Sequence, residues 1–245
     1  MTDIRSIVAL AAALSATALL AACGGTATIM GSPSIAGASG PPAPAPTVRV
    51  GDRWVYNAVD GYRQKITWTE THEVTAIGAD GIRVNVTLQG SNIDIARTEI
   101  WSAPGVVRSG SIYEAETDRF DPALVRYQYP LTNDASWSQQ VRDLNKPPGP
   151  YGPIRFHARV GGYESVTTPA GTFDAIKIRY LIQLDDETFW RYPTQCDYVV
   201  WYAAAVGAMV REQKRSYYLE KDVEAAPQVP GQRAVYELVS FTRGR

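Results

Sequence analysis

Strict alternation of polar and apolar residues is the feature that most limits how this chain can fold. Residues 81–88, Gly-Ile-Arg-Val-Asn-Val-Thr-Leu, alternate without a break, and residues 175–180, Ala-Ile-Lys-Ile-Arg-Tyr, do the same. Successive side chains of a β-strand point to opposite faces, so the pattern predicts strands with one buried and one solvated face. Turn signals at Gly81 and Gly171 separate such runs. We expect an all-β, mainly antiparallel domain in which only residues 121–126 could form a helical turn.

The two halves of the alternating region resemble each other. The shared landmarks, in chain order, are Trp54, the Gly81 turn and Trp101 in the first half, and Trp137, the Gly171 turn and Trp201 in the second. Two related β-meanders that share one curved sheet or half-barrel would give this order. The similar hairpins that recur in any antiparallel sheet would also give it.

The first 22 residues are typical of a signal peptide. Arg5 precedes an apolar run over residues 7–20, which is short for a membrane span of about 20 residues. Residues 20–23, Leu-Ala-Ala-Cys, resemble the lipobox of bacterial lipoproteins, which is cut between Ala22 and Cys23. The resemblance implies that Cys23 carries a diacylglycerol and that acyl chains such as palmitate anchor the protein. An ordinary secretory signal with a coincidental cysteine, or an uncleaved anchor, is the alternative.

Gly24 bears on the membrane that receives the protein. In Gram-negative lipoproteins an Asp at this position commonly retains the protein at the inner membrane. For a Gram-negative host, the resemblance therefore implies a lipoprotein of the cell outer membrane that faces the periplasm.

Residues 24–46 consist almost entirely of Gly, Ala, Ser, Thr and Pro. They contain too few large apolar side chains to offset the entropy cost of ordering. We therefore expect residues 1–22 to be a signal peptide, residues 23–46 an acylated cysteine with a disordered tether, and residues 47–245 a single β-rich domain. The net charge of −1 offers no basic field for nucleic acid.

Residues with catalytic or metal-binding potential are few. A thiol mechanism would need Cys196 beside His157, oriented by Asp197 or Asp185, yet no nucleophile motif surrounds Cys196. His72 and His157 lack the close ligand spacing of a metal site. No glycine-rich phosphate motif is present. We expect no catalytic residues, no metal and no other cofactor.

Aromatic residues crowd the last third of the chain. A curved sheet offers a concave face, and Tyr and Trp combine an apolar ring with a polar tip, so these residues could line a pocket for an apolar ligand. A sheet core with cross-strand aromatic pairs is the ordinary alternative. The candidate pocket residues are Trp190, Tyr198, Trp201 and Tyr202. The ligand hypothesis predicts a continuous apolar cavity that opens near Trp190 and Trp201.

Several motifs together resemble the DUF3108-like family of exported bacterial proteins. They are Tyr-Pro-Leu at residues 129–131 with Trp137, Gly-Tyr-Glu-Ser-Val at 162–166, Pro-Ala-Gly-Thr-Phe-Asp-Ala at 169–175, and Trp-Tyr at 201–202 with Val-Arg at 210–211. The resemblance spans residues 52–241 but rests on turn and core positions, and residues 203–207 depart from the family's usual Pro and Gly. It implies a curved antiparallel sheet, comparable to the half-barrels of the LolA/LolB-type lipoprotein carriers, and an envelope location. It carries over no catalytic residue.

These features leave three classes of function. The leading hypothesis is a lipid-anchored, non-enzymatic envelope protein that binds a lipid or other apolar ligand, or an envelope partner protein. The second is a structural or assembly factor that docks through exposed strand edges or through the proline-rich residues 146–153. The third is an enzyme with an unrecognised site, which would need a His or Cys beside a carboxylate in a cleft.

Overall fold

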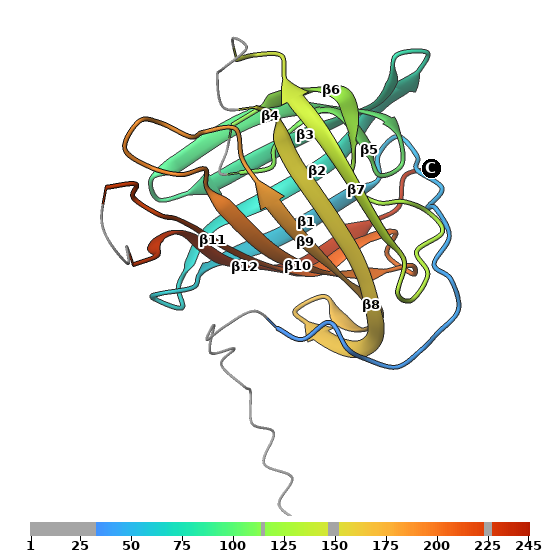
Figure 1. Cartoon of the computed structure of the whole chain (residues 1–245). Coiled ribbons are helices and arrows are strands. Elements are labelled where there is room, and N and C mark those ends of the chain that lie inside the picture. Colours follow the sequence, from blue (N-terminus) through green and yellow to red (C-terminus); the bar gives the residue numbers. More distant parts are fainter. Residues whose placement is uncertain (1–32, 114–115, 147–151, 223–226) are drawn as a thin grey trace, which may run out of the picture. The chain divides into compact units, whose positions relative to one another are not determined.

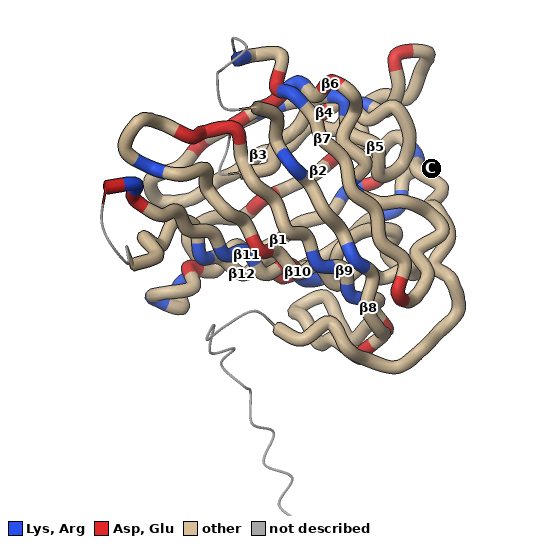
Figure 2. The backbone as a smooth tube through the Cα atoms, in the orientation of Figure 1, with Lys and Arg blue, Asp and Glu red and all other residues tan. Residues whose placement is uncertain are grey.

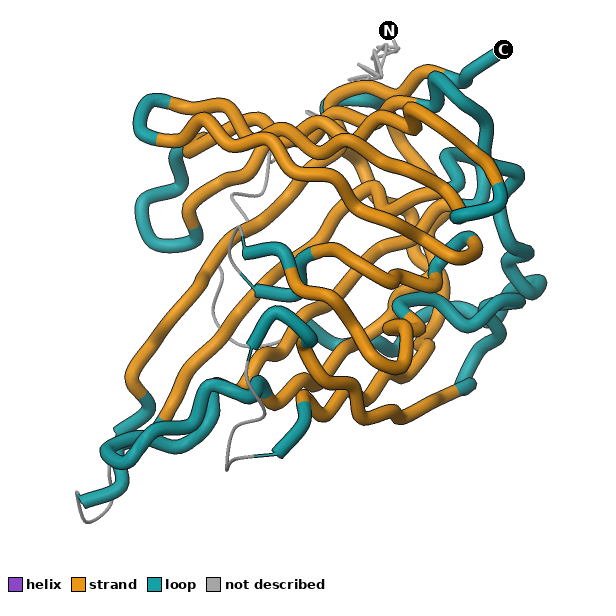
Figure 3. Tube along the Cα trace, turned by 90° about the horizontal axis from the view of Figure 1, so that it is seen from above, coloured by secondary structure: helices purple, strands orange, loops and turns teal. Residues whose placement is uncertain are grey.

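Twelve antiparallel strands make up the regular structure of the residues described by this computed structural model, which are 33–113, 116–146, 152–222 and 227–245 (Figure 1). The strands are β1 (Arg53–Asp60), β2 (Ile66–Gly78), β3 (Gly81–Gly90), β4 (Ile93–Ala103), β5 (Val106–Gly110), β6 (Asp118–Val125), β7 (Ser136–Asp143), β8 (Ile154–Thr168), β9 (Gly171–Gln183), β10 (Gln195–Ala203), β11 (Ala208–Tyr218) and β12 (Val229–Thr242). Within the described ranges only strands and loops occur (Figure 3). The all-β prediction is confirmed.

Each strand pairs with the next along the chain, and β12 pairs with β1 from Arg53↔Thr242 to Asp60↔Ala234. The curvature expected from the sequence is therefore carried through to a closed barrel. Closure pairs the two strands that would otherwise be edges, so their backbone groups are satisfied within the sheet.

The repeat seen in the sequence corresponds to two runs of six strands, β1–β6 and β7–β12. Trp54 and Trp137 lie in β1 and β7, and Trp101 and Trp201 lie near the ends of β4 and β10. The two landmark turns join β2 to β3 and β8 to β9. The repeated landmarks thus occupy equivalent strands of one continuous meander.

The seam between β6 and β7 has the shortest ladder of the barrel, with only the pairs Phe120↔Asp143 and Asp121↔Arg142. Beyond them, side chains replace backbone pairing. Trp137 Nε1 donates to the carbonyl of Val125 at 2.8 Å, and the amide of Val125 donates to Gln139 Oε1 at 3.2 Å. The helical turn expected at residues 121–126 is wrong, because residues up to Val125 belong to β6.

The hairpin of β8 and β9 extends past the barrel and folds back over the outside of β10–β12 (Figure 1). The amide of Ala170 donates to the carbonyl of Leu238 at 3.1 Å, and Arg211 Nη2 donates to the carbonyl of Thr167 at 3.0 Å. Val166 packs in the same buried cluster as Trp201. The outer face of β10 is therefore covered as well as its inner face.

Residues 33–46, which we call the N-terminal strap, lie against the barrel, where the sequence predicted a free tether. Ala43 exchanges two backbone hydrogen bonds with Leu131, at 2.9 and 2.8 Å. The carbonyl of Ile35 accepts a bond from the amide of Gly162 at 2.8 Å. A Cβ added to Gly162 would lie 2.3 Å from the backbone of Gly37, so glycine permits this close approach. The low apolar content of residues 33–46 predicted a free tether. The strap is instead held by backbone hydrogen bonds and by close contacts between glycines, which composition does not indicate.

Residues 1–32 lie outside the described residues. Cys23, Ala22, the signal peptide and the first part of the tether belong to that segment. Cleavage and lipidation therefore stay predictions from the sequence.

Candidate functional site

The inner face of the barrel surrounds a cavity of about 120 Å³. Both charged and aromatic side chains line it, and they come from strands far apart in the sequence. Its charged residues are Glu70, His72, Arg97, Glu99, Arg126, Glu212 and Lys214; its aromatic residues are Trp54, Tyr56, Trp101, Tyr127, Tyr129, Phe156, Tyr180, Tyr198 and Tyr236. The cavity thus combines apolar and aromatic walls, as the sequence predicted, with a charged cluster that it did not predict.

Strands β2 and β4 build the centre of this site. His72 Nε2 lies 2.6 Å from Glu70 Oε1, and Arg97 Nη2 lies 3.5 Å from the same oxygen. Arg97 Nη2 is also 3.8 Å from Glu99 Oε1, and Arg126 Nη1 is 3.7 Å from Glu99 Oε2. The five side chains form one ion-pair network inside the barrel.

Arg97 is the member of the network with unused donors. Its side chain is only 9 % exposed, yet its Nε and Nη1 atoms have no hydrogen-bond partner among the described residues. A buried charged donor without a partner is costly, so a cavity beside it favours a molecule with acceptor atoms. This is the polar position in the barrel that most needs a partner.

The two central carboxylates are held in the ionised form. Burial by itself raises the pKa of Glu70, but the hydrogen bond and charge of His72, with the charges of Arg97 and Lys214, outweigh it and lower the pKa to about 2. Burial also raises the pKa of Glu99, and the charges of Arg126, His72 and Arg97 again lower it overall. Neither carboxylate is poised to exchange a proton near neutral pH.

A second charged pair lies on β11. Lys214 Nζ is 3.5 Å from Glu212 Oε2, and it sits over the rings of Tyr198 and Tyr236 at 5.2 and 4.9 Å from their centroids. Burial raises the pKa of Tyr198 and Tyr236 well above the ordinary value, so both phenols stay neutral. Aromatic faces and hydroxyl groups thus share this wall of the cavity.

One end of the cavity is bounded by loops. Pro46 and Val48, which precede β1, lie there with Pro104 of the β4–β5 turn and Gly207 of the β10–β11 turn. All four are partly exposed. They lie at the barrel end where the strap leads into β1.

The four aromatic residues predicted from the sequence do not come together. Tyr198 lines the cavity. Tyr202 packs on Tyr127 and Tyr129, with ring centroids 5.4 and 5.7 Å away, and both of those line it. Trp201 points to the opposite face of β10, where its Nε1 donates to Glu164 at 2.6 Å.

Trp190 lies on the β9–β10 loop, 40 % exposed, with its ring centroid 5.7 Å from that of Tyr218. The prediction that a cavity opens near Trp190 and Trp201 is wrong. Trp190 lies on a surface loop, and Trp201 lies on the outer side of the barrel wall.

The charged centre of the site was missed at the sequence level, although a signal for it exists. Ile93, Ile95, Arg97, Glu99 and Trp101 alternate along β4 and so share one face. Arg97 and Glu99 therefore continue an apolar, inward-facing row. Charged residues in such a row indicate a buried polar site.

The histidine and cysteine candidates are separated by the barrel wall. Cys196 packs in the core beside Tyr198, and burial raises the pKa of its thiol to about 12. His157 lies on the exposed outer face of β8, with Nδ1 2.8 Å from Ser138 Oγ. No group of three or more His, Cys, Asp or Glu side chains that could hold a metal ion occurs within the described ranges.

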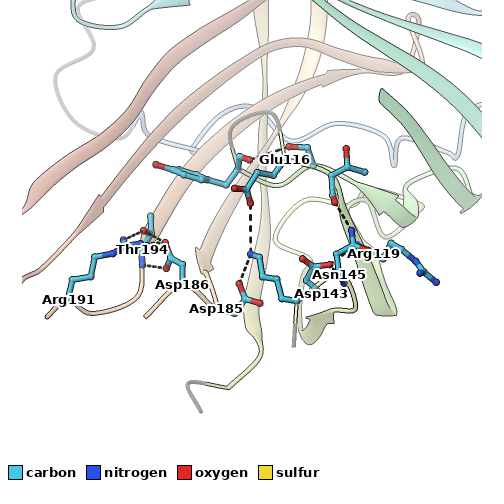
Figure 4. A network of polar contacts seen from close by, with 12 residues as sticks. Glu116, Arg119, Asp143, Asn145, Asp185, Asp186, Arg191 and Thr194 are labelled. Atoms are coloured by element: carbon cyan, nitrogen blue, oxygen red, sulfur yellow. Dashed lines mark hydrogen bonds and ion pairs between the residues drawn. The ribbon is translucent and has the colours of Figure 1, made fainter. Parts of the chain in front are cut away.

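A separate polar network joins the loops at the other end of the barrel (Figure 4). Lys146 Nζ lies 3.2 Å from Asp185 Oδ1 and 4.0 Å from Glu116 Oε2. Asp186 accepts hydrogen bonds from the amide and hydroxyl of Thr194 at 2.8 and 2.6 Å. The charged and polar groups of this network pair with one another, and they tie the β5–β6, β7–β8 and β9–β10 connections together. The proline-rich residues proposed as a docking loop lie partly outside the described residues.

The chain was compared with curated proteins and with solved structures. No curated protein matches this chain. The chain is similar to an exported-protein candidate with a YmcC-like fold from Bacteroides fragilis, with 14 % identity, a TM-score of 0.45, and coverage of 82 % of this chain and 100 % of that one. It is also similar to a candidate lipoprotein from Parabacteroides distasonis, with 14 % identity, a TM-score of 0.44, and coverage of 83 % and 100 %.

The described residues contain no helix with the length and hydropathy of a membrane span.

The model of the DUF3108-like family matches residues 155–217, which form β8, β9, β10 and most of β11. The family resemblance that the sequence motifs indicated is confirmed over this stretch.

Proposed function

We propose that this protein is a lipid-anchored, non-enzymatic protein of the bacterial cell envelope that binds an amphiphile through the interior of its barrel. The observation that carries the proposal is Arg97, whose buried Nε and Nη1 atoms lie beside a cavity and have no hydrogen-bond partner in the described part of the chain. The anchor rests on Cys23 of the lipobox-like segment.

The ligand chemistry follows from the donor. A guanidinium with unused N–H groups favours a carboxylate or phosphate oxygen, because charge-assisted hydrogen bonds are the stronger ones. Glu70, Glu99 and Glu212 balance the charges of three cationic groups in the cavity, which are Arg97, Arg126 and Lys214.

The size of the cavity limits the part of the ligand that enters. At about 120 Å³ it is smaller than the roughly 300–1,000 Å³ of ordinary ligand pockets. A headgroup and the first carbons of a chain fit that space. The apolar tail would leave between Val48 and Gly207, past residues that are already partly exposed.

An enzyme is the less favoured interpretation. His72 beside Glu70 does satisfy the requirement for a histidine next to a carboxylate in a cavity. However, the lowered pKa of Glu70 removes it as a general acid near neutral pH, and the raised pKa of Cys196 keeps that thiol protonated. Binding uses the ionised carboxylates as they stand.

Docking of an envelope partner is a second candidate function, favoured by the β9–β10 loop. Phe189 is 83 % exposed, and Trp190 and Tyr192 are 40 % and 49 % exposed. Exposed aromatic rings are common anchors of protein interfaces. A photo-crosslinking residue at position 189 would capture a defined partner in cells if this loop docks, and the same residue at Arg83, on the outer face of β3, serves as the control.

Calorimetric titration with octanoate, octanol and octylamine tests the ligand proposal, because the three differ only in the headgroup. We expect octanoate to bind about tenfold or more tightly than octanol, since a hydrogen bond to a charged group contributes about 1.5–3 kcal/mol. Arg97→Gln should remove this difference, and Arg83→Gln, on an exposed site of β3, should retain it.

Val48→Trp provides a second variant that leaves the charged network intact. It should weaken the binding of all three ligands by blocking the route from the cavity. Equal affinity for all three headgroups in the unmodified protein, or no binding of any, would contradict the proposal.

A further inference from the structure

Basic side chains gather on the outer face of β8 and β9, away from the barrel interior. Arg155, His157 and Arg159 alternate with buried residues along β8, so all three point outward. Arg159 lies directly opposite Arg179 of β9. Figure 2 shows these basic segments running along the two strands. Like charges placed opposite each other are destabilising, so this arrangement favours a negatively charged partner.

The acidic residues that face this surface neutralise it only in part. Asp197 of β10 accepts hydrogen bonds from Arg179 Nε and Nη2, both at 2.8 Å, and its Oδ2 lies 3.3 Å from Arg215 Nη2. Asp134 lies 3.5 Å from Arg159 Nη2, in a pair whose side chains are 85 % and 60 % exposed. None of these pairs includes Arg155, whose charge adds to that of the surface.

The surface is hollowed and has an apolar centre. Two adjoining depressions of about 780 and 630 Å³ share His157, Arg179 and Leu181. Leu181 is 45 % exposed in their midst. Long basic side chains around an exposed apolar residue suit a lipid–water interface, where the charge meets headgroups and the apolar part meets the acyl boundary.

The N-terminal strap forms one wall of the second depression, through residues 34–37 and Ser39. Lys177 Nζ donates to the carbonyls of Ser34 and Ala36 and pairs with Glu164 at 2.8 Å, which fixes the strap beside the arginines. Cys23 lies only ten residues before Pro33, and an extended chain of that length spans at most about 35 Å. The lipid anchor and the basic surface are therefore held within short reach of each other.

We propose that the outer face of β8 and β9 rests on anionic phospholipid headgroups of the membrane that holds the anchor. Arg155 and Arg159 contact the phosphates, and Leu181 faces the interface. The anchor is part of the proposed function, so the membrane in this inference rests on it, but the headgroup contacts do not need the lipid. The surface orients the barrel on the membrane, whereas the acyl chains only hold it there.

Vesicle binding of the unlipidated chain, residues 24–245, tests the surface without the anchor; this chain contains every described residue. We expect sedimentation with vesicles that contain phosphatidylglycerol, little with purely zwitterionic vesicles, and weakening at high salt, since each arginine near a membrane contributes about fivefold in affinity. Arg155→Glu with Arg159→Glu should lower the affinity for anionic vesicles at least about tenfold. Arg63→Glu with Arg83→Glu changes the net charge equally at exposed sites elsewhere and should lower it far less.

Equal binding to both kinds of vesicle, or equal losses in the two double variants, would overturn the inference. Arg155→Gln with Arg159→Gln removes the charge without reversing it and should give an intermediate loss. Membrane fractionation of Cys23→Ser in cells tests the anchor separately, so failure of the surface and failure of the anchor give different results.

Discussion

The imidazole of His72 and the carboxylate of Glu70 lie 2.6 Å apart inside the barrel, two residues apart on the same face of β2. This contact turns what would be an apolar core into a charged one, because Arg97 and Glu99 join it from β4. Buried ion pairs seldom add stability over a well-packed apolar core. In the proposed function these charges hold the ligand headgroup, and they also make the fold sensitive to acid.

Acid should weaken the fold through Glu70. Its pKa is lowered from 4.5 to about 2 in the folded protein, so its contribution to stability is complete above pH 4.5 and is lost as the pH falls through about 2. The loss is on the order of 3 kcal/mol. Urea unfolding at a series of pH values should show a steeper fall for the unmodified protein than for Glu70→Gln. Parallel curves for the two would contradict the assignment.

A rise from acidic to neutral pH should weaken the fold through Asp118, which lies at the barrel end that carries the loop network of Figure 4. Burial, with the neighbouring Asp143, raises the pKa of Asp118 from 3.8 to about 7. A raised carboxyl pKa means that stability is full below about pH 3.8 and declines as the pH rises through 7. Asp118→Asn should therefore unfold at higher urea than the unmodified protein above pH 7, by on the order of 2 kcal/mol. Asp121→Asn, at a side chain that is 52 % exposed, is the control and should show no such gain.

The β6–β7 seam should open first when its side-chain bond is removed. Trp137→Phe keeps a six-membered ring but removes the Nε1 donor, so the carbonyl of Val125 retains only the longer bond from Gln139 Nε2 at 3.4 Å, at a cost of about 1 kcal/mol. Hydrogen exchange should accelerate in β6 and β7 ahead of the other strands. Trp190→Phe, on the exposed loop, should leave the exchange pattern unchanged, and uniform acceleration around the barrel would argue against a weak seam.

The strap should detach when the glycines beneath it gain side chains. A Cβ at Gly162 would lie 2.3 Å from the backbone of Gly37, so Gly162→Val must displace the strap. Limited proteolysis should then cut within residues 33–46 several-fold faster, while the barrel remains resistant. Gly78→Ala, where a Cβ would meet nothing within 4 Å, should cut at the original rate. Unchanged cleavage in Gly162→Val would show that the strap is not seated there.

Local alternation was enough to predict the strands, but not their closure. The run at residues 81–88 became β3 with the expected inward and outward sides. Closure depends on pairing between β1 and β12, and no local pattern in either strand encodes a partner so distant in the chain. The repeat of Trp54 and Trp137 did anticipate the two equivalent runs of strands.

The candidate site was harder to predict, for a physical reason. Tyr198 and Trp201 are three positions apart on β10, so they face opposite sides of the wall. Both are buried, because the folded-back β8–β9 hairpin covers the outside of β10. Burial on both faces removes the alternation that would have told them apart. Arg97 was overlooked because an arginine in a strand is ordinarily a surface residue, although it shares a face with the apolar Ile93 and Ile95, and the structure shows that this face lines the cavity.

The measurement that tests the central claim most directly is native mass spectrometry of the protein purified from its own envelope, compared with Arg97→Gln purified in the same way. If the barrel interior binds an amphiphile, the unmodified protein will carry a small adduct with a carboxylate or phosphate group. The variant, shown by circular dichroism to retain its β structure, will have lost most of it. Bare protein in both samples, or the same adduct at the same occupancy in both, would contradict a binding site at Arg97.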